Sequence, residues 1–171
     1  SFPTRRSSDL RTLAFSPDSK LLATGSFDNT VRLWNTANSQ PHGWPLRHPG
    51  DVTSVVFSPD GKQLASASAA GSARIWNVVP DPFVAPRVFE HASRVGALAL
   101  SPNDGQHMAT GSSDGRARLW NTTSGSLLFE PWRNQGEVIF VAISADGNML
   151  ATGWSSTSKG MVEFRDMATG E

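Results

Sequence analysis

The sequence contains no cysteine, has no net charge and includes no long apolar run. Without cysteine, the chain can form neither a disulfide framework nor a metal site with thiolate ligands. The 15 Lys and Arg residues balance 15 Asp and Glu residues, so no overall field favours nucleic acid or an anionic membrane as a partner. The longest apolar run, residues 138–143, is far shorter than the ~20 residues of a membrane-spanning helix. We therefore expect no nucleic-acid partner and no membrane insertion. The lack of cysteine does not identify a compartment, and the location that we expect is cytoplasmic.

The sequence also lacks the usual signatures of nucleotide and metal sites. Its glycines in SPDG and ATGSSDG fall in turns between predicted strands, and not at the strand-to-helix junction that cradles phosphate. The four histidines form no HxxxH or HxH pair, and no carboxylate cluster shows the spacing of metal ligands. We therefore predict no metal and no cofactor.

What the sequence does contain is a unit that recurs four times. Equivalent apolar runs end at intervals of 42 or 43 residues, at Phe15, Phe57, Leu100 and Ile143. Each run enters a turn, and the four copies read LAFSPD, VVFSPD, LALSPN and VAISAD. A second block follows each turn and reads NTVRLWN, GSARIWN, GRARLWN and GMVEFRD, so Arg165 replaces the tryptophan of the other copies. A period of this length is typical of one propeller blade.

These blocks resemble the WD-repeat family, whose members fold as β-propellers and serve as interaction platforms. The resemblance covers residues 11–171. It implies an all-β fold, a partial WD-repeat β-propeller of four blades with mostly four antiparallel strands each, in an incomplete ring. We expect the repeats at about residues 10–47, 52–90, 95–132 and 138–171. Because the final ATGE resembles the turn before an outer strand, we expect missing blades of a full-length chain among its partners.

Residues 1–9, SFPTRRSSD, do not match the repeat. Translated back into DNA, they read TCT TTC CCT ACA CGA CGC TCT TCC GAT, which is part of a common sequencing-library adapter. We interpret this segment as an adapter artefact on the repeat domain of residues 10–171, and a short disordered basic tail is the alternative. Native coding DNA that reads through the same residues would contradict the artefact.

The third repeat contains a hydroxyl, an imidazole and a carboxylate, which together could form a nucleophilic triad. In WD repeats these groups and the tryptophan instead form a buried structural hydrogen-bond network, and a buried carboxylate and imidazole need each other as partners. We therefore expect a structural network and a protein that is not an enzyme. The residues at these positions are His91, Thr110 or Ser112 as the hydroxyl, Asp114 and Trp120.

The other repeats keep only parts of this set. The first keeps Asp28 and Trp34, and the second keeps His48 and Trp76 but has Ala70 in place of the aspartate. The fourth has Asn134 in place of the histidine. We therefore expect a complete network only in the third repeat. Arginines precede each tryptophan by two residues, and we interpret Arg32, Arg74 and Arg118 as structural and not as a phosphate-binding ladder.

Binding is expected on the face formed by two sets of loops, because partners of this family often dock there. Aligned by position, the turns between second and third strands present Phe27, Ala69, Ser113 and Trp154. The loops that enter the first strands present Asp51, Arg94 and Glu137. Aromatic and arginine side chains dominate binding hot spots, so Phe27, Arg94 and Trp154 are the leading candidates. The alternative is that Phe27 packs locally and Trp154 compensates for an irregular blade.

Our main prediction is a scaffold that binds protein or peptide on this face. The segments GWPLRHPGDV and LLFEPWRNQGEV also resemble linkers of bacterial WD-repeat arrays, which are often attached to protein kinases. The chain contains none of the kinase signature strings. The alternative is therefore the regulatory or sensory portion of a larger bacterial signalling enzyme, such as a serine/threonine protein kinase.

Overall fold

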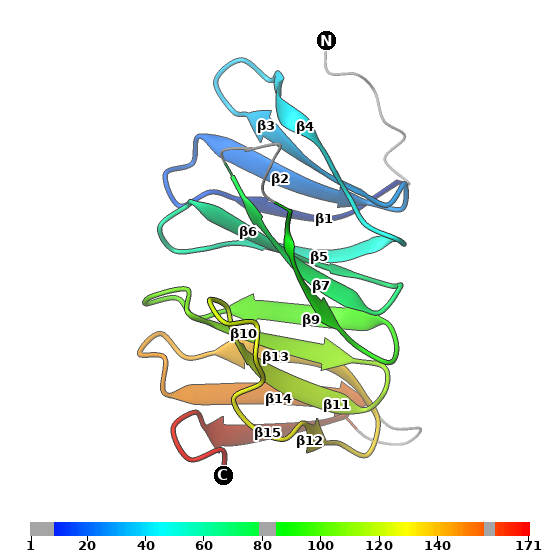
Figure 1. Cartoon of the computed structure of the whole chain (residues 1–171), viewed down its shortest axis with the longest axis vertical. Helices are drawn as coiled ribbons and strands as arrows, with labels where there is room; N and C mark the ends of the chain where they lie inside the picture. The colour runs from blue at the N-terminus through cyan, green and yellow to red at the C-terminus, as the bar shows by residue number, and fades with distance from the viewer. Residues whose placement is uncertain (1–8, 79–84, 156–159) are drawn as a thin grey trace.

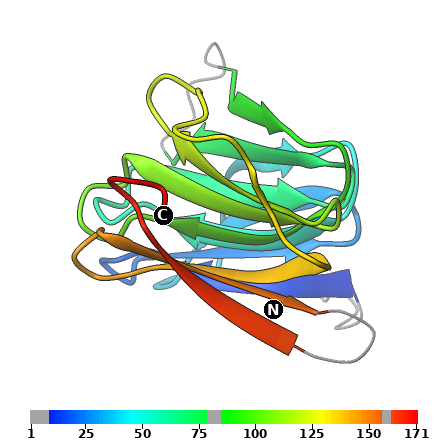
Figure 2. The same cartoon turned by 90° about the horizontal axis from the view of Figure 1, so that it is seen from below.

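The computed structural model describes residues 9–78, 85–155 and 160–171, which form four separate antiparallel sheets. The sheets follow one another in chain order along the long axis of the molecule, so the first and last sheets are the ends of a row (Figure 1). Seen along that axis, the sheets lie one behind another (Figure 2). Within the described ranges, no helix has the length and apolarity needed to cross a membrane.

Each sheet is one blade, with its strands paired in chain order. Blade 1 contains β1 (Leu10–Phe15), β2 (Leu21–Ser26), β3 (Thr30–Asn35) and β4 (Pro41–Arg47). Blade 2 contains β5 (Val52–Phe57), β6 (Gln63–Ser68), β7 (Ser72–Asn77) and β8 (Arg87–Glu90). Blade 3 contains β9 (Val95–Leu100), β10 (His107–Ser112), β11 (Arg116–Asn121) and β12 (Trp132–Arg133). Blade 4 contains β13 (Glu137–Ile143), β14 (Met149–Ser155) and β15 (Gly160–Asp166).

The all-β fold and the division into four blades are as the repeats predicted. One outer strand differs, because the sequence predicted it at residues 127–132 and β12 has only two residues. Before β12, a single bridge joins Trp120 to Leu127. Pro131, which has no N–H to donate to a ladder, directly precedes the short strand. The tail predicted at residues 1–9 lies outside the described residues except for Asp9.

The turn between the first two strands of each blade is fixed by a recurring serine and aspartate. In blade 2 the hydroxyl of Ser58 donates to Asp60 Oδ1 at 2.6 Å and accepts from the amide of Gln63 at 2.9 Å. Gly61 adopts a φ of 70° in this turn. Ser19, at the equivalent position of blade 1, adopts a φ of 59° without being a glycine. The same turn geometry is therefore reached at a higher conformational cost in blade 1.

The blades pack on one another through a repeated set of apolar side chains. Val52, Val55 and Phe57 of β5 are buried against blade 1 in one core cluster, where they meet Ala23, Val31 and Leu33. Equivalent clusters join blade 2 to blade 3 and blade 3 to blade 4. Burying each of these larger side chains contributes about 1.5–3 kcal/mol. The core is therefore a series of interfaces between sheets, and each middle blade is covered on both faces.

Candidate interaction face

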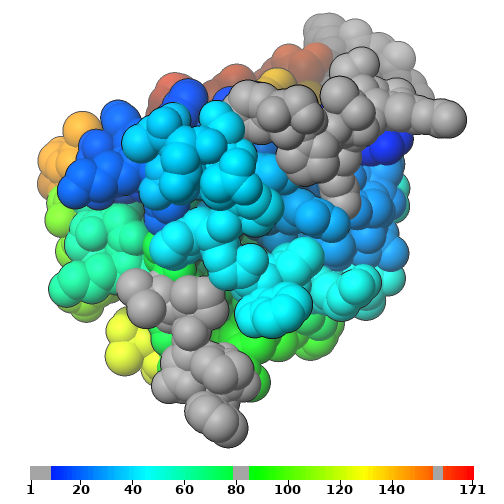
Figure 3. Space-filling view, turned by 90° about the horizontal axis from the view of Figure 1, so that it is seen from above, coloured from blue at the N-terminus to red at the C-terminus, as the bar shows by residue number. Residues whose placement is uncertain are grey.

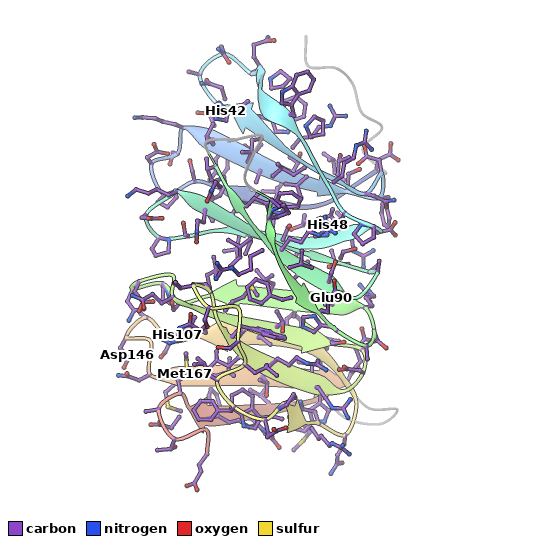
Figure 4. The ribbon with its side chains drawn as sticks, in the orientation of Figure 1. His42, His48, Glu90, His107, Asp146 and Met167 are labelled. Atoms are coloured by element: carbon purple, nitrogen blue, oxygen red, sulfur yellow. The ribbon has the colours of Figure 1, made fainter. Side chains whose placement is uncertain are left out.

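The loops that enter the first strands meet the turns between the second and third strands at one edge of the row. The turn amide donates to the carbonyl oxygen of the entry residue in three blades: Phe27 to Asp9 at 2.9 Å, Ala69 to Asp51 at 2.8 Å and Ser113 to Arg94 at 3.0 Å. Figure 4 shows His48 and Glu90, which precede two entry loops, at this edge, whereas His107 and Asp146 lie at the opposite edge. We call the first edge the loop face, and its residues are Phe27, Asp51, Arg94, Ser113 and Glu137.

Phe27 supplies apolar surface to the loop face. Its side chain is 45% exposed, and the guanidinium of Arg11 lies 5.3 Å from the centre of its ring. A cation at this distance is attracted by the negative face of the ring, with about 0.5–1 kcal/mol at an exposed site. The contact places an aromatic surface and a positive charge side by side on blade 1.

Arg94 and Glu137 bring charge to the same face from neighbouring blades. Arg94 Nη1 lies 3.3 Å from Glu137 Oε1, and both side chains are partly exposed. An ion pair of this kind contributes only about 0–1 kcal/mol to stability, because water competes for both groups. Ser113 is exposed and Asp51 is half-buried at the corresponding loops. The entry positions therefore differ in charge from blade to blade.

Trp154 is not on the loop face, which corrects the sequence alignment. It pairs with Val138 in the sheet, as Ser68 pairs with Val52 in blade 2 and Ser112 with Val95 in blade 3. Trp154 thus occupies a buried β14 position, one residue before the position equivalent to Phe27, and is only 5% exposed. The loop that follows has a different length in this blade, so alignment on the loop shifted the register by one residue.

The candidate triad residues of blade 3 belong to a structural hydrogen-bond network. His91 Nδ1 lies 3.0 Å from the carbonyl oxygen of Phe89 and His91 Nε2 lies 2.8 Å from Thr110 Oγ1, while Trp120 Nε1 donates to the same hydroxyl at 2.9 Å. Because a carbonyl only accepts, Nδ1 carries the proton and the Thr110 hydroxyl donates to Nε2. Thr110 is fully buried. The Thr110 hydroxyl is therefore not exposed to a substrate, and it already donates its proton to His91.

Asp114 bonds to Arg118 and not to the imidazole, which differs from the expected carboxylate–histidine pairing. Arg118 Nη2 donates to Asp114 Oδ2 at 2.7 Å and Nη1 donates to Oδ1 at 3.3 Å. Burial alone would raise the pKa of Asp114, but the hydrogen bonds and charge of Arg118 outweigh it and lower that pKa. Ser112 lies beside this pair, where its hydroxyl accepts from the amide of Asp114 at 3.3 Å. The sequence predicted a structural role for Arg118 but missed its pairing with Asp114, for which the signal was the spacing of four residues across a tight hairpin.

Blades 1 and 2 contain smaller versions of this hydrogen-bond network. In blade 2, Ser66 Oγ lies 2.6 Å from His48 Nε2 and accepts from Trp76 Nε1 at 2.7 Å. In blade 1, Trp34 Nε1 donates to Thr24 Oγ1 at 2.9 Å. Asp28 is further along the same hairpin and accepts from the amide of Thr30 at 3.1 Å and from its hydroxyl at 2.7 Å.

Both network histidines are held neutral. Burial, and then the charge of Arg74, lowers the pKa of His48 to about 4. Burial, and then the charge of Arg118, lowers the pKa of His91 to about 4. Only a neutral imidazole has a ring nitrogen that can accept a hydrogen bond from a hydroxyl group. Among the residues that the structure describes, no group of three or more His, Cys, Asp or Glu side chains is placed to hold a metal ion.

Comparison with known proteins identifies the repeats. The family model for "WD domain, G-beta repeat" matches residues 2–35, 45–77 and 85–121. The crystal structure of the computationally designed Ika4 protein superposes with a TM-score of 0.79 and 23% sequence identity, over 97% of this chain and 95% of that chain. At this identity the likeness concerns the fold alone. A search of the curated proteins finds no match.

Proposed function

The chain belongs to the WD-repeat family, and on this premise we propose that it is a non-enzymatic scaffold that binds a protein or peptide through its loop face. WD-repeat domains generally mediate contacts between proteins. The observation that carries the proposal is the exposed Phe27 ring, with the Arg11 cation over it, at an edge where the entry loops add charged groups. The buried hydroxyl of Thr110, bonded on both sides, argues against hydrolytic chemistry at the third repeat.

The loop face suits an extended peptide of mixed character. Phe27 offers an aromatic surface to an apolar side chain, and such surfaces are enriched in binding hot spots. Asp51 and Glu137 offer carboxylates to basic side chains, while Arg94 offers a donor to a carboxylate or carbonyl group. We expect the Arg94–Glu137 pair to exchange its internal contact for contacts with the partner, since a partly exposed pair costs little to open.

Selection of peptides from a random displayed library tests this function. We expect the Phe27→Ala and Arg94→Ala variants to bind the selected peptides at least about 10-fold more weakly than the wild type, as hot-spot truncation does. Lys20→Ala and Lys62→Ala are matched controls, because both lysines are exposed next to turns at the opposite edge. Loss of binding in the control variants and not in the loop-face variants would contradict the proposed face.

The bacterial-type linker segments favour a second candidate, the regulatory portion of a larger bacterial signalling enzyme such as a serine/threonine protein kinase. These segments are residues 43–52 and 127–138. The coding sequence on either side of this region tests that candidate. Kinase motifs in the same reading frame would support it, and further repeats alone would contradict it.

A further inference from the structure

Blade 2 lacks the carboxylate that blades 1 and 3 carry in the turn after the second strand. In blade 1, Asp28 accepts from the hydroxyl of Thr30 at 2.7 Å. In blade 3, Asp114 accepts from Arg118 Nη2 at 2.7 Å. The donors of these bonds lie two and four residues after the aspartate. Blade 2 has Ala70 at the aspartate position, so its hairpin has no carboxylate for donors at these two positions.

Ser72 and Arg74 are the corresponding donors of blade 2, and each has an atom without a partner. Strand register aligns Ser72 with Thr30 of blade 1. It aligns Arg74 with Arg118 of blade 3, since each arginine pairs with the residue whose hydroxyl accepts from the tryptophan. Ser72 is 2% exposed, and its hydroxyl has no hydrogen-bond partner among the described residues. Arg74 Nη1 donates to the carbonyl oxygen of Arg47 at 2.8 Å, but its buried Nε atom has no partner in the same part of the chain.

His48 is a third donor of blade 2 without an acceptor. Its Nε2 atom lies 2.6 Å from Ser66 Oγ, which accepts from Trp76 Nε1 at 2.7 Å. The Ser66 hydroxyl has no other acceptor among the residues that the structure describes, so it donates to Nε2 and His48 Nδ1 carries the ring proton. In blade 3 the equivalent proton goes to the carbonyl oxygen of Phe89. His48 is 6% exposed, and within the described ranges its Nδ1 atom has no partner.

These three donors lie on one side of β7. Side chains alternate along a strand, so Ser72, Arg74 and Trp76 share a face. The guanidinium carbon of Arg74 lies 5.7 Å from the centre of the Trp76 ring, and the centre of the His48 ring lies 5.7 Å from that of Trp76. We call Ser72, Arg74 and His48 the donor cluster. Because buried polar groups are nearly always hydrogen-bonded, the cluster favours a ligand group that accepts.

The described carboxylates of the chain do not bind the donor cluster. Glu90 lies opposite Ser72 on β8, and it is exposed. Asp51 is half-buried in the entry loop, where its carbonyl oxygen accepts from the amide of Ala69. Among the residues that the structure describes, no carboxylate forms an ion pair with Arg74. The positive charge of this arginine is therefore not neutralised within the described chain.

The donor cluster belongs to the loop face. Blade 2 lies inside the row, and in the space-filling view from above the described surface belongs mostly to blade 1 (Figure 1 and Figure 3). Figure 4 shows His48 at the edge that carries the loop face. Ala70 is exposed next to the cluster, and Arg74 is half-buried. Because Ala70 ends at its Cβ atom, it does not occupy the donors as the carboxylate of Asp114 does in blade 3.

We propose that the donor cluster binds the side-chain carboxylate of an aspartate or glutamate in the peptide that docks on the loop face. The carboxylate accepts from the hydroxyl of Ser72 and from the guanidinium of Arg74, which are the two contacts that the aspartates make in blades 1 and 3. His48 Nδ1 is a third donor beside them. A carboxylate only accepts, and its charge complements that of Arg74. The inference rests on the proposed scaffold function and adds the class of side chain that the loop face recognises.

Peptides selected on the wild-type chain from a random displayed library test the inference. We expect Asp or Glu at one position of the selected sequences. In a synthetic copy of one such peptide, replacing this residue by Asn or Gln should weaken binding to the wild type at least about 10-fold, since a charged acceptor is lost. Ala70→Asp supplies an internal carboxylate, so the acidic peptide and its amide copy should bind this variant with similar affinity. Isothermal titration calorimetry measures the four affinities.

Two further variants separate the donor cluster from the rest of the face. Ala69→Asp adds the same charge one residue away and should keep the preference for the acidic peptide, whereas Phe27→Ala should weaken both peptides equally. Selected peptides without an acidic preference, or a preference that Ala70→Asp retains or Ala69→Asp removes, would overturn the inference and leave the scaffold function intact. Failure to select any peptide that binds the loop face would overturn both.

Discussion

Arg165 donates from Nη1 to the hydroxyl of Thr152 at 3.0 Å, as the tryptophan donates to the equivalent hydroxyl in the other three blades. The equivalent bond from Trp120 to Thr110 is 2.9 Å long. The Arg165 guanidinium also lies 5.5 Å from the centre of the Trp132 ring. An arginine therefore keeps the donor at this position although the sequence motif is lost.

The first prediction concerns this bond. Arg165→Met should lower the free energy of unfolding by about 1–2 kcal/mol, because the fully buried Thr152 hydroxyl loses its donor. Arg165→Trp restores an indole donor and should stay within about 1 kcal/mol of the wild type. Urea denaturation measures both values. Glu163→Gln is the control, since it breaks only the partly exposed ion pair with Arg165. A methionine variant as stable as the wild type would show that the bond contributes nothing.

The second prediction compares the aspartate position of two blades. Asp114→Ala should lower the free energy of unfolding by about 3–5 kcal/mol, because it leaves the buried Arg118 without its carboxylate. Ala70→Asp should raise it by about 1 kcal/mol, since Ala70 is exposed at the same position of blade 2 and Arg74 takes the place of Arg118. Chemical denaturation in urea measures both. No gain from Ala70→Asp would mean that the carbonyl of Arg47, which accepts from Arg74 at 2.8 Å, already satisfies this guanidinium.

The third prediction is a dependence of stability on pH. The pKa of His48 and of His91 falls from 6.5 to about 4 on folding, so the unfolded chain binds more protons than the folded chain between these values. The free energy of unfolding should therefore be constant above about pH 6.5 and fall as the pH drops toward 4. His91→Gln should flatten this slope, whereas His42→Gln, outside the network, should retain it. An unchanged slope in the His91 variant would assign the effect to other groups.

The fourth prediction exchanges the turn residues of blades 1 and 2. Ser19→Gly should raise the free energy of unfolding by about 1 kcal/mol, because the left-handed backbone at this position favours glycine. The reciprocal change Gly61→Ser should lower it by a similar amount, and the neighbouring Pro17 at 3.5 Å leaves room for the added Cβ. Thermal denaturation of the two variants checks the opposite signs. If both substitutions changed the free energy of unfolding in the same direction, backbone strain would not be the cause of these changes.

The sequence predicted the blades and most strand ranges because period-two alternation and turn residues are local signals. It did not predict that Asp114 bonds to Arg118, since the choice between two partners depends on side-chain directions across a hairpin. It also placed Trp154 on the surface, because the alignment followed the loop and not the strand register. Trp154 pairs with Val138 of the neighbouring strand, and no local pattern contains that pairing.

The exposed apolar side chains of blades 1 and 4 illustrate the same limit. Leu13 and Phe164 have the residue types of buried positions, and the repeat predicts that they are interface residues. Their exposure in the described chain depends on how the sheets are arranged in space, and this follows only from the row of four blades. The loop face, in contrast, follows from loop positions alone, apart from the register of blade 4.

The most direct test of the account is a map of amide chemical-shift changes when a peptide selected on this chain is added. The account predicts that the shifts cluster on the loop face, at Phe27, Asp51, Arg94, Ser113 and Glu137. It also predicts that the turns at the opposite edge, around Lys20 and Lys62, remain unchanged. Shifts that cluster on those turns would contradict the proposed binding site.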